Sequence, residues 1–393
     1  MADTDPSLDQ APDTIAAAHA LKDALMTRAG EMDEVRRLPA DLAKTLAKAG
    51  LFRMVIPIAY GGLQLPPGQI VETVEAISEA NASAGWCVMI GATTALNAAY
   101  MDPTFAAEIY GPADTITGGV FAPMGKAVPD GEDYIVSGRW PWGSGSENCS
   151  WLCGGSMMME GDDIARLPNG MPDARMMIFP KTDATLHDTW HVAGLKGTGS
   201  GDISVDKIRV PKGRSVSLVT DAPKVDGALY AFPAFGLLAL GVASVALGNA
   251  RGALEAIKML ATAKRPQGSS KTLSEKQVTQ VELSKMEAAL RSARAYLMDE
   301  LDQTWGLAET TGSIPVERRA DLRLACTHMV RTAAKVARKS YDIGGGAALF
   351  SENELQRRFR DAHAMTQHVA TAPGTYEQTG RILFNLPTHG GMI

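Results

Sequence analysis

The sequence predicts a mixed α+β protein in which a small β-rich centre lies between two helical regions. Apolar residues recur at helical spacing from Thr14 to Ala49, and helical patterns return in long runs after Phe232. Between Thr115 and about Pro211 the apolar runs become short and β-rich, with Gly, Pro and Asp residues separating them. The chain can also bury a large core, because 45% of its 393 residues are hydrophobic and only 21% are charged.

These changes in pattern divide the chain into four segments. Residues 1–12, rich in Asp, Pro and Ala, are predicted to be a disordered arm. Residues 13–114 are expected to form an N-terminal helical domain, 115–225 a middle β-domain, and 226–393 a C-terminal helical bundle domain.

The individual elements follow from the same periodicities. Gly50 is a plausible C-cap for a helix that begins near Pro39. Further helices are expected at Val71–Ala80, Ala84–Ala99, Leu237–Ala263, Ser274–Trp305 and Pro315–Tyr341. Strands are expected at Tyr134–Val136, Trp151–Gly154, Arg175–Phe179, Thr189–Val192 and Ile203–Val210.

Charge and composition exclude several classes of function. The chain has 38 basic and 44 acidic side chains and contains no cationic block, so we expect no nucleic-acid partner. The N-terminus is polar and acidic, and no apolar run reaches the roughly 18 residues that span a bilayer, so we expect a cytoplasmic protein without a membrane segment. The four cysteines do not have the spacing of a zinc site, so no metal is expected.

Three Gly-rich motifs stand in order within the β-rich centre. They are GGVFAPMGKAVP at 118–129, GRWPWGSGSENCSW at 138–151 and GLKGTGSGD at 194–202. The third motif precedes a strand rather than a helix, so it has no helix N-terminus to offer to a dinucleotide phosphate.

In this order the motifs resemble those of the acyl-CoA dehydrogenase superfamily, and the first resembles its flavin-dependent monooxygenase branch more closely than its dehydrogenases. The resemblance implies an acyl-CoA dehydrogenase-like α+β fold with an N-terminal helical domain, a central β-domain and a C-terminal helical bundle. It also implies that the Ser144 hydroxyl or N–H contacts the flavin N5 edge, and that Trp142 and Phe121 bind the same cofactor. A plain turn is the alternative interpretation of Ser144.

Two further matches to the family lie in the C-terminal region. Arg265 stands where the family places an arginine that reaches a neighbouring subunit's flavin, although a helix-terminal charge would explain it equally. Gly345 and Gly346 resemble a Gly-Gly loop whose N–H groups cradle flavin phosphate. The resemblance implies a homotetramer built as a dimer of dimers.

The catalytic glutamate of the dehydrogenases has no counterpart here. The matching position, after an Arg-Asp-Ala sequence, is Val369, and the stretch between Asp226 and Glu255 supplies no acidic residue either. Without a carboxylate to remove the α-proton, dehydrogenation loses its general base. His368 is therefore the predicted catalytic group beside this position, and His363 is the second candidate.

The resemblance then implies oxygen chemistry. Reduced flavin would react with O2 to form a C4a-hydroperoxyflavin that hydroxylates a small aromatic or heteroaromatic substrate, with Trp86, Asn97 and Tyr100 as candidate substrate contacts. We expect reduced FMN as the cofactor, with FADH2 possible. A separate flavin reductase would supply it, because the chain has no nicotinamide-binding motif.

Two other functions remain open at this point. One is an acyl-CoA dehydrogenase or flavin oxidase with a relocated base, and the other is a non-catalytic helical assembly protein. The presence of Ser144, Arg265 and the loop of three glycines that begins at Gly344 argues against the second. No residue in the sequence selects one substrate.

Overall fold

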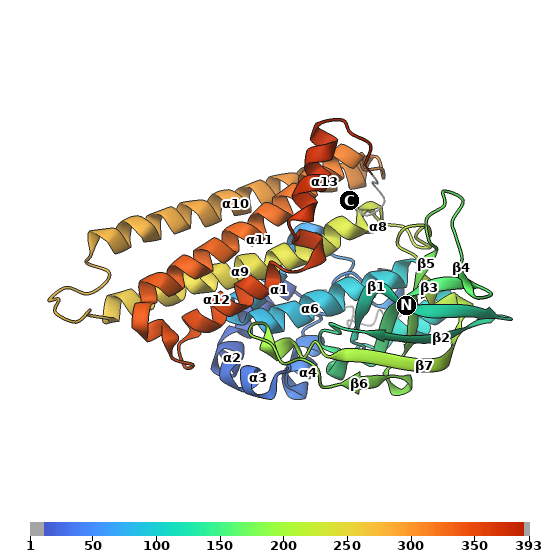
Figure 1. Cartoon of the computed structure of the whole chain (residues 1–393), viewed down its shortest axis with the longest axis horizontal. Helices are drawn as coiled ribbons and strands as arrows, with labels where there is room; N and C mark the ends of the chain where they lie inside the picture. Colours follow the sequence, from blue (N-terminus) through green and yellow to red (C-terminus); the bar gives the residue numbers. More distant parts are fainter. Residues whose placement is uncertain (1–11, 389–393) are drawn as a thin grey trace, which may run out of the picture.

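The computed structural model describes residues 12–388, so the arm predicted for residues 1–12 lies outside the described residues except for Pro12. Helices occupy the first part of the chain, a twisted sheet forms the middle part, and long helices extend away from the sheet in the last part (Figure 1). This confirms the predicted α+β order, while the segment boundaries themselves stay predictions.

The N-terminal part is a cluster of short helices around the buried helix α6. Its helices are α1 (Thr14–Ala20), α2 (Lys22–Thr27), α3 (Ala29–Val35), α4 (Ala40–Lys48), α5 (Pro67–Ala80), α6 (Ala82–Thr94) and α7 (Pro103–Tyr110). Gly50 has φ +76°, and its N–H donates to Ala47 O at 2.9 Å, so it ends α4 as predicted. The short 3-10 turns η1 (Ile58–Tyr60) and η2 (Ala95–Ala99) follow α4 and α6.

The middle part is one eight-stranded sheet. The strands are β1 (Thr117–Asp130), β2 (Asp133–Trp140), β3 (Trp151–Glu160), β4 (Asp163–Ile164), β5 (Ala174–Pro180), β6 (Thr185–His187), β7 (Asp202–Pro211) and β8 (Ser215–Val216). Their order is β6-β7-β2-β1-β3-β5-β8, with β4 paired to β3. Among the strands of residues 12–388, only β1 and β3 pair in parallel.

One predicted strand is wrong. Thr189–Val192 is irregular, and the strand in this region is β6, which ends at His187. The Thr189 side chain bonds Asp202, and the backbone N–H groups of Thr189 and His191 donate to oxygens two residues earlier. These local bonds occupy backbone groups that a ladder would need, so β-propensity alone misplaced the strand.

The C-terminal part is built on three long helices. Its elements are α8 (Ala228–Ala231), α9 (Ala234–Ala263), α10 (Gln277–Thr310), α11 (Val316–Gly344), η7 (Gly345–Leu349), α12 (Glu354–Met365), η8 (Val369–Thr371) and α13 (Gly374–Leu383). By length and composition α9 would be able to cross a membrane, but 89% of its most apolar window is buried inside the protein. It is therefore a core helix. A location in the cytoplasm stays a prediction.

The sheet is closely packed around Trp140. This side chain is fully buried, and its Nε1 donates to Gly155 O at 2.6 Å. A Cβ on Gly154 would stand 2.5 Å from the Trp140 ring, and Gly125 and Gly138 leave similarly little room. The glycines thus make the space that the indole fills, next to the turn that carries Trp142.

We predict that Gly154→Ala destabilises the protein, because the new methyl group must displace the Trp140 ring at a typical overpacking cost of about 1–3 kcal/mol. Gly306→Ala is the matched control. Gly306 lies within α10, with nothing within 4 Å of an added Cβ, so alanine should raise stability by up to about 1 kcal/mol. Urea unfolding followed by circular dichroism measures both. Equal midpoints for Gly154→Ala and the wild type would contradict the packing argument.

Candidate functional site

A chain of buried hydrogen bonds joins α6 to the two Gly-rich turns. Trp86 Nε1 on α6 donates to Ser144 Oγ at 3.0 Å, and Ser144 Oγ lies 2.7 Å from Ser200 Oγ. Ser200 Oγ lies 2.6 Å from Thr198 Oγ1, which in turn donates to Leu195 O at 2.8 Å. Ser144 is only 6% exposed, so its hydroxyl is held inside the protein.

The far end of this chain is fastened to α12. Leu195 has φ +53°, and its N–H donates to Asp361 Oδ1 at 2.6 Å. Arg360 bonds Ala193 O, and Gly194 packs so closely on Arg360 O that an added Cβ would stand 2.2 Å away. Burial raises the pKa of Asp361 to about 6, although the bond from Leu195 N–H opposes the shift.

His368 lies directly against the near end of the chain. Its ring meets the Trp86 ring edge-on, with centroids 5.5 Å apart. It is the N-cap residue of η8, where Nδ1 accepts a bond from Ala370 N–H at 3.3 Å. Burial lowers the pKa of His368 to about 4, and the charge of Arg323 lowers it further. The imidazole is therefore neutral near pH 7, and because Nδ1 accepts, the proton is assigned to Nε2.

Two exposed apolar side chains flank this buried core. Val369, beside His368, is 81% exposed, and Trp142, two residues before Ser144, is 60% exposed. Trp142 also has φ +69°, a strained conformation for a bulky residue. An exposed indole on a strained turn is a surface that a flat ring system would cover.

Other predicted cofactor and substrate residues line the interior nearby. Phe121 on β1 meets Phe235 at the start of α9, with ring centroids 5.2 Å apart. Asn97 is 3% exposed and its buried Oδ1 has no hydrogen-bond partner among the described residues. Tyr100 is buried and its pKa is raised by that burial. Asn97 follows Trp86 by eleven residues, roughly 16 Å along a helix axis, so it does not join the Trp86–His368 contact.

His363 lies apart from His368. It is exposed on α12, where its ring packs on Phe359 with centroids 4.7 Å apart, and Phe359 stacks on Tyr341. Partial burial lowers the pKa of His363, and the charge of Arg338 adds to this. No ring contact or hydrogen bond found among residues 12–388 links it to Trp86 or Ser144.

Arg265, Gly345 and Gly346 gather at the end of the helical bundle, in the α9–α10 loop and at η7. Arg265 is exposed in the loop between α9 and α10, and its neighbour Lys264 donates from Nζ to Gly344 O at 2.7 Å. Gly345 has φ +54°, a conformation that favours glycine. This end of the helical bundle points away from the sheet (Figure 1), so the predicted flavin residues form two separate groups within one chain.

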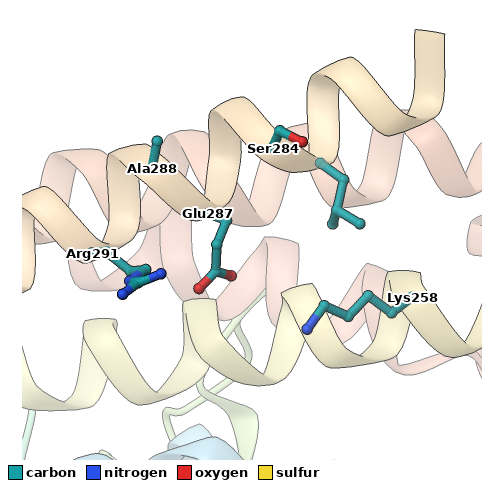
Figure 2. A pocket seen from close by; sticks show the side chains of 6 residues that line it. Lys258, Ser284, Glu287, Ala288 and Arg291 are labelled. Carbon is teal, nitrogen blue, oxygen red and sulfur yellow. The ribbon is translucent and has the colours of Figure 1, made fainter. Parts of the chain in front are cut away.

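The surface also has a hollow that contains none of the predicted site residues. It measures about 480 Å³ and lies between α9 and α10, where Lys258 faces Ser284, Glu287 and Arg291 (Figure 2). A second, of about 10 Å³, lies beneath the Ser144 turn, lined by Cys87 and Cys149 among others. Burial raises the pKa of both thiols to about 12, which makes them unreactive.

Several residues of this site were not predicted. Ser200 and Thr198 belong to the third Gly-rich motif, and Asp361 belongs to the Arg-Asp-Ala sequence, but neither motif was assigned side-chain contacts. For Thr198 and Ser200, the alternation of small hydroxyl residues with glycines at 197–201 was the sequence signal that could have predicted them. Arg323, which donates to Ala370 O at 2.8 Å, had no signal in its helical sequence.

Two family descriptions match the chain. The acyl-CoA dehydrogenase N-terminal domain matches residues 15–103, and the acyl-CoA dehydrogenase C-terminal domain matches residues 240–373. Both regions are helical in the structure.

Relatives that match nearly the whole chain identify its branch within this superfamily. Indole-3-acetate monooxygenase from Pseudomonas putida is 32% identical over 373 residues, covering 94% of this chain and 93% of that protein. The chain belongs to the flavin-dependent monooxygenase branch of the acyl-CoA dehydrogenase superfamily. The oxygenase component of an FADH2-dependent resorcinol hydroxylase from a Rhizobium species is 28% identical and covers 88% of both chains. The crystal structure of 3-HSA hydroxylase from Rhodococcus sp. RHA1 superposes with a TM-score of 0.89 at 26% identity, covering 97% and 99% of the two chains.

The prediction of a flavin-dependent oxidoreductase that uses reduced flavin is thereby confirmed. The site of this monooxygenase agrees with that chemistry, because the exposed residue beside His368 is Val369, which cannot act as a base. The buried carboxyl group nearest in sequence, Asp361, is bonded to Leu195 N–H instead.

We predict that His368 stays neutral down to about pH 5. The folded pKa near 4 lies below the usual value of about 6.5, so acid must protonate a buried group that resists charge. Because the unfolded chain binds a proton at His368 more readily than the folded protein does, the folded state is favoured by the neutral imidazole. That contribution to the free energy of unfolding is fully present above pH 6.5 and is lost as the pH falls toward 4. A pH titration of isotope-labelled histidine followed by NMR would show an Nε2-protonated His368 ring whose midpoint lies near pH 4. The signal of His368 is assigned by its absence from the spectrum of His368→Gln. A midpoint between pH 6 and 7 would contradict the prediction.

Proposed function

We propose that this enzyme is the oxygenase component of a two-component system that hydroxylates a small aromatic substrate bearing an oxygen substituent. The observation that supports the proposal is the contact of the neutral His368 imidazole with Trp86, whose Nε1–H donates to Ser144 Oγ, next to the exposed Val369. This arrangement offers a hydrogen-bond donor and apolar surface where a dehydrogenase needs a carboxylate.

The residues present fit a flavin ring. Trp142 exposes its indole on a strained turn, and Phe121 offers a second aromatic side chain between that turn and α9. Ser144 is small, so its side chain would not displace a ring whose edge lies against it. When bound, reduced flavin supplies the two electrons that allow one atom of O2 to enter the substrate and the other to leave as water.

His368 would orient the substrate through Nε2. Since Nδ1 accepts from Ala370 N–H, the Nε2–H group is the free donor and pairs with an oxygen on the substrate, such as a phenol oxygen. A substrate ring N–H needs an acceptor, which this tautomer does not offer at Nε2. The Trp86 ring limits the tilt of the imidazole, and the low pKa keeps the donor uncharged. Asn97 and Tyr100 are further proposed contacts for a part of the substrate remote from His368, because the buried Asn97 amide oxygen has no hydrogen-bond partner among the described residues.

We propose FADH2 as the flavin in use and a separate reductase as its source. The resorcinol hydroxylase relative is named for FADH2, and its designation as an oxygenase component supports a divided system. This choice goes beyond the sequence, from which reduced FMN was preferred with FADH2 as the alternative. The aromatic substrate class is supported by the indole-3-acetate monooxygenase and resorcinol hydroxylase relatives.

We also propose that two copies complete each flavin site, within a homotetramer. Arg265 and the Gly345–Gly346 turn lie far from Ser144 in the same chain (Figure 1), so they fit a neighbour's flavin better than their own. Large apolar side chains are exposed at this same end, which supports its burial in an assembly. They are Met259, Val278, Leu349 and Phe350.

We predict that His368→Gln lowers product formation by about 10² while leaving the affinity for reduced flavin nearly unchanged, because the lost group orients substrate. The assay contains FAD, NADH, a flavin reductase and indole-3-acetate under air. His363→Gln is the matched control and should retain activity, because His363 lies on the exposed face of α12. Omission of the reductase should abolish turnover. Full activity of His368→Gln, or turnover by the wild type with NADH alone, would contradict this account.

Subunit complementation tests the shared site. Arg265→Ala should weaken flavin binding at the neighbour's site, whereas Ser144→Trp should block the chain's own site. Co-expression of the two variants should restore sites that combine an intact Ser144 with an intact Arg265, giving about a quarter of wild-type flavin capacity by random pairing. Capacity that stays at the level of the separate variants would refute the shared site.

A further inference from the structure

The chain of buried hydroxyls has two ends of fixed hydrogen-bonding character. At one end, Trp86 Nε1–H can only donate, and it donates to Ser144 Oγ. At the other end, the Leu195 carbonyl can only accept, and it accepts from Thr198 Oγ1. Between them stand three hydroxyls, Ser144, Ser200 and Thr198, each with a single proton.

These ends determine the direction of every bond. The Thr198 proton goes to Leu195 O, so the 2.6 Å contact between Thr198 and Ser200 requires the Ser200 proton. The 2.7 Å contact between Ser200 and Ser144 then requires the Ser144 proton. Ser144 thus donates inward and accepts from Trp86, and one lone pair remains for a ligand.

The same loop holds this direction in place. Leu195 O also accepts from Trp190 Nε1 at 3.0 Å, and Leu195 N–H is fixed by Asp361. Turning the carbonyl away would leave the Trp190 Nε1–H and the Thr198 hydroxyl without their acceptor, at a cost of about 1–3 kcal/mol each. Reversal of the hydroxyls is therefore opposed from the backbone end of the chain.

We propose that Ser200 and Thr198 determine which redox state of the flavin this enzyme prefers, by committing the Ser144 proton inward. The inference rests on the proposed function, in which Ser144 contacts the N5 edge. Reduced flavin carries a hydrogen on N5 and can donate to the remaining lone pair of Ser144. Oxidised flavin has only a lone pair at N5, so two acceptors would face each other in a dry site.

The preference has a direct use in a two-component system. The oxygenase takes reduced flavin from solution, where oxidised flavin competes, and it must release the oxidised form after turnover. A hydrogen bond gained by one form and an unpaired acceptor left by the other correspond to a difference in Kd of about tenfold or more.

The experiment measures the Kd of reduced FAD, by anaerobic titration, and of oxidised FAD, by fluorescence quenching. The variants are Ser200→Ala, which frees the Ser144 proton, and Thr198→Val, which allows the Ser200 hydroxyl to turn toward Ser144. Ser244→Ala is the matched control, because Ser244 is a fully buried hydroxyl in α9 that donates to Leu240 O at 2.7 Å, within its own helix.

We expect the ratio of the oxidised to the reduced Kd to fall about tenfold in both variants and to stay unchanged in Ser244→Ala. That change lowers the two-electron potential of the bound flavin by about 30 mV. A structural defect alone would weaken the binding of reduced and of oxidised FAD equally, and that result would overturn the inference. Equal affinities of the wild type for the two forms would overturn it as well. The wild type and both variants could also show the same ratio of oxidised to reduced Kd while the wild type still forms product. In that case this inference fails and the proposed function stays intact.

Discussion

The structure of the site depends on the requirement that buried polar groups be paired. Four segments that are distant in sequence meet through one chain of bonds, from Trp86 on α6, through Ser144 and Ser200 on two turns, to Leu195 and Asp361 at α12. None of these groups reaches solvent freely, so displacement of one leaves its neighbour unpaired at about 1–3 kcal/mol. The sheet and the two helical regions are thereby held in one arrangement at the site.

The same burial decides the chemistry of the ionisable groups. Desolvation moves the pKa of His368 down to about 4 and that of Asp361 up to about 6. Both shifts favour the neutral form, and near pH 7 the His368 imidazole beside Trp86 is uncharged. A site of this kind suits oxygen transfer, in which orientation of substrate and exclusion of water matter more than removal of a carbon-bound proton.

Periodicity and motif order predicted most of the fold. The buried α6 and α9 follow from uninterrupted apolar runs, and the end of α4 follows from Gly50. The strand placed at Thr189–Val192 failed because side-chain and local backbone bonds compete with β-pairing there, and a propensity argument does not see such competition.

The candidate site was predictable only in part. The substitution of Val369 and the position of His368 were readable from one motif, whereas the role of Ser200 and Thr198 depends on distances between turns 56 residues apart. His363 was a candidate by proximity in sequence, yet five residues along the chain take it to the exposed side of α12. Arg265 and Gly345 matched the family individually, and only the fold shows that they lie at the end of the helical bundle away from the sheet, whereas Ser144 follows strand β2.

The central claim is that this site oxygenates its substrate and does not dehydrogenate it. Isotope labelling tests the claim most directly, with the enzyme, a flavin reductase, NADH, FAD and indole-3-acetate incubated under ¹⁸O2 and the product analysed by mass spectrometry. The account predicts one ¹⁸O atom in each product molecule, with the second atom of O2 in water. A product that has lost two hydrogens and carries no ¹⁸O would contradict it.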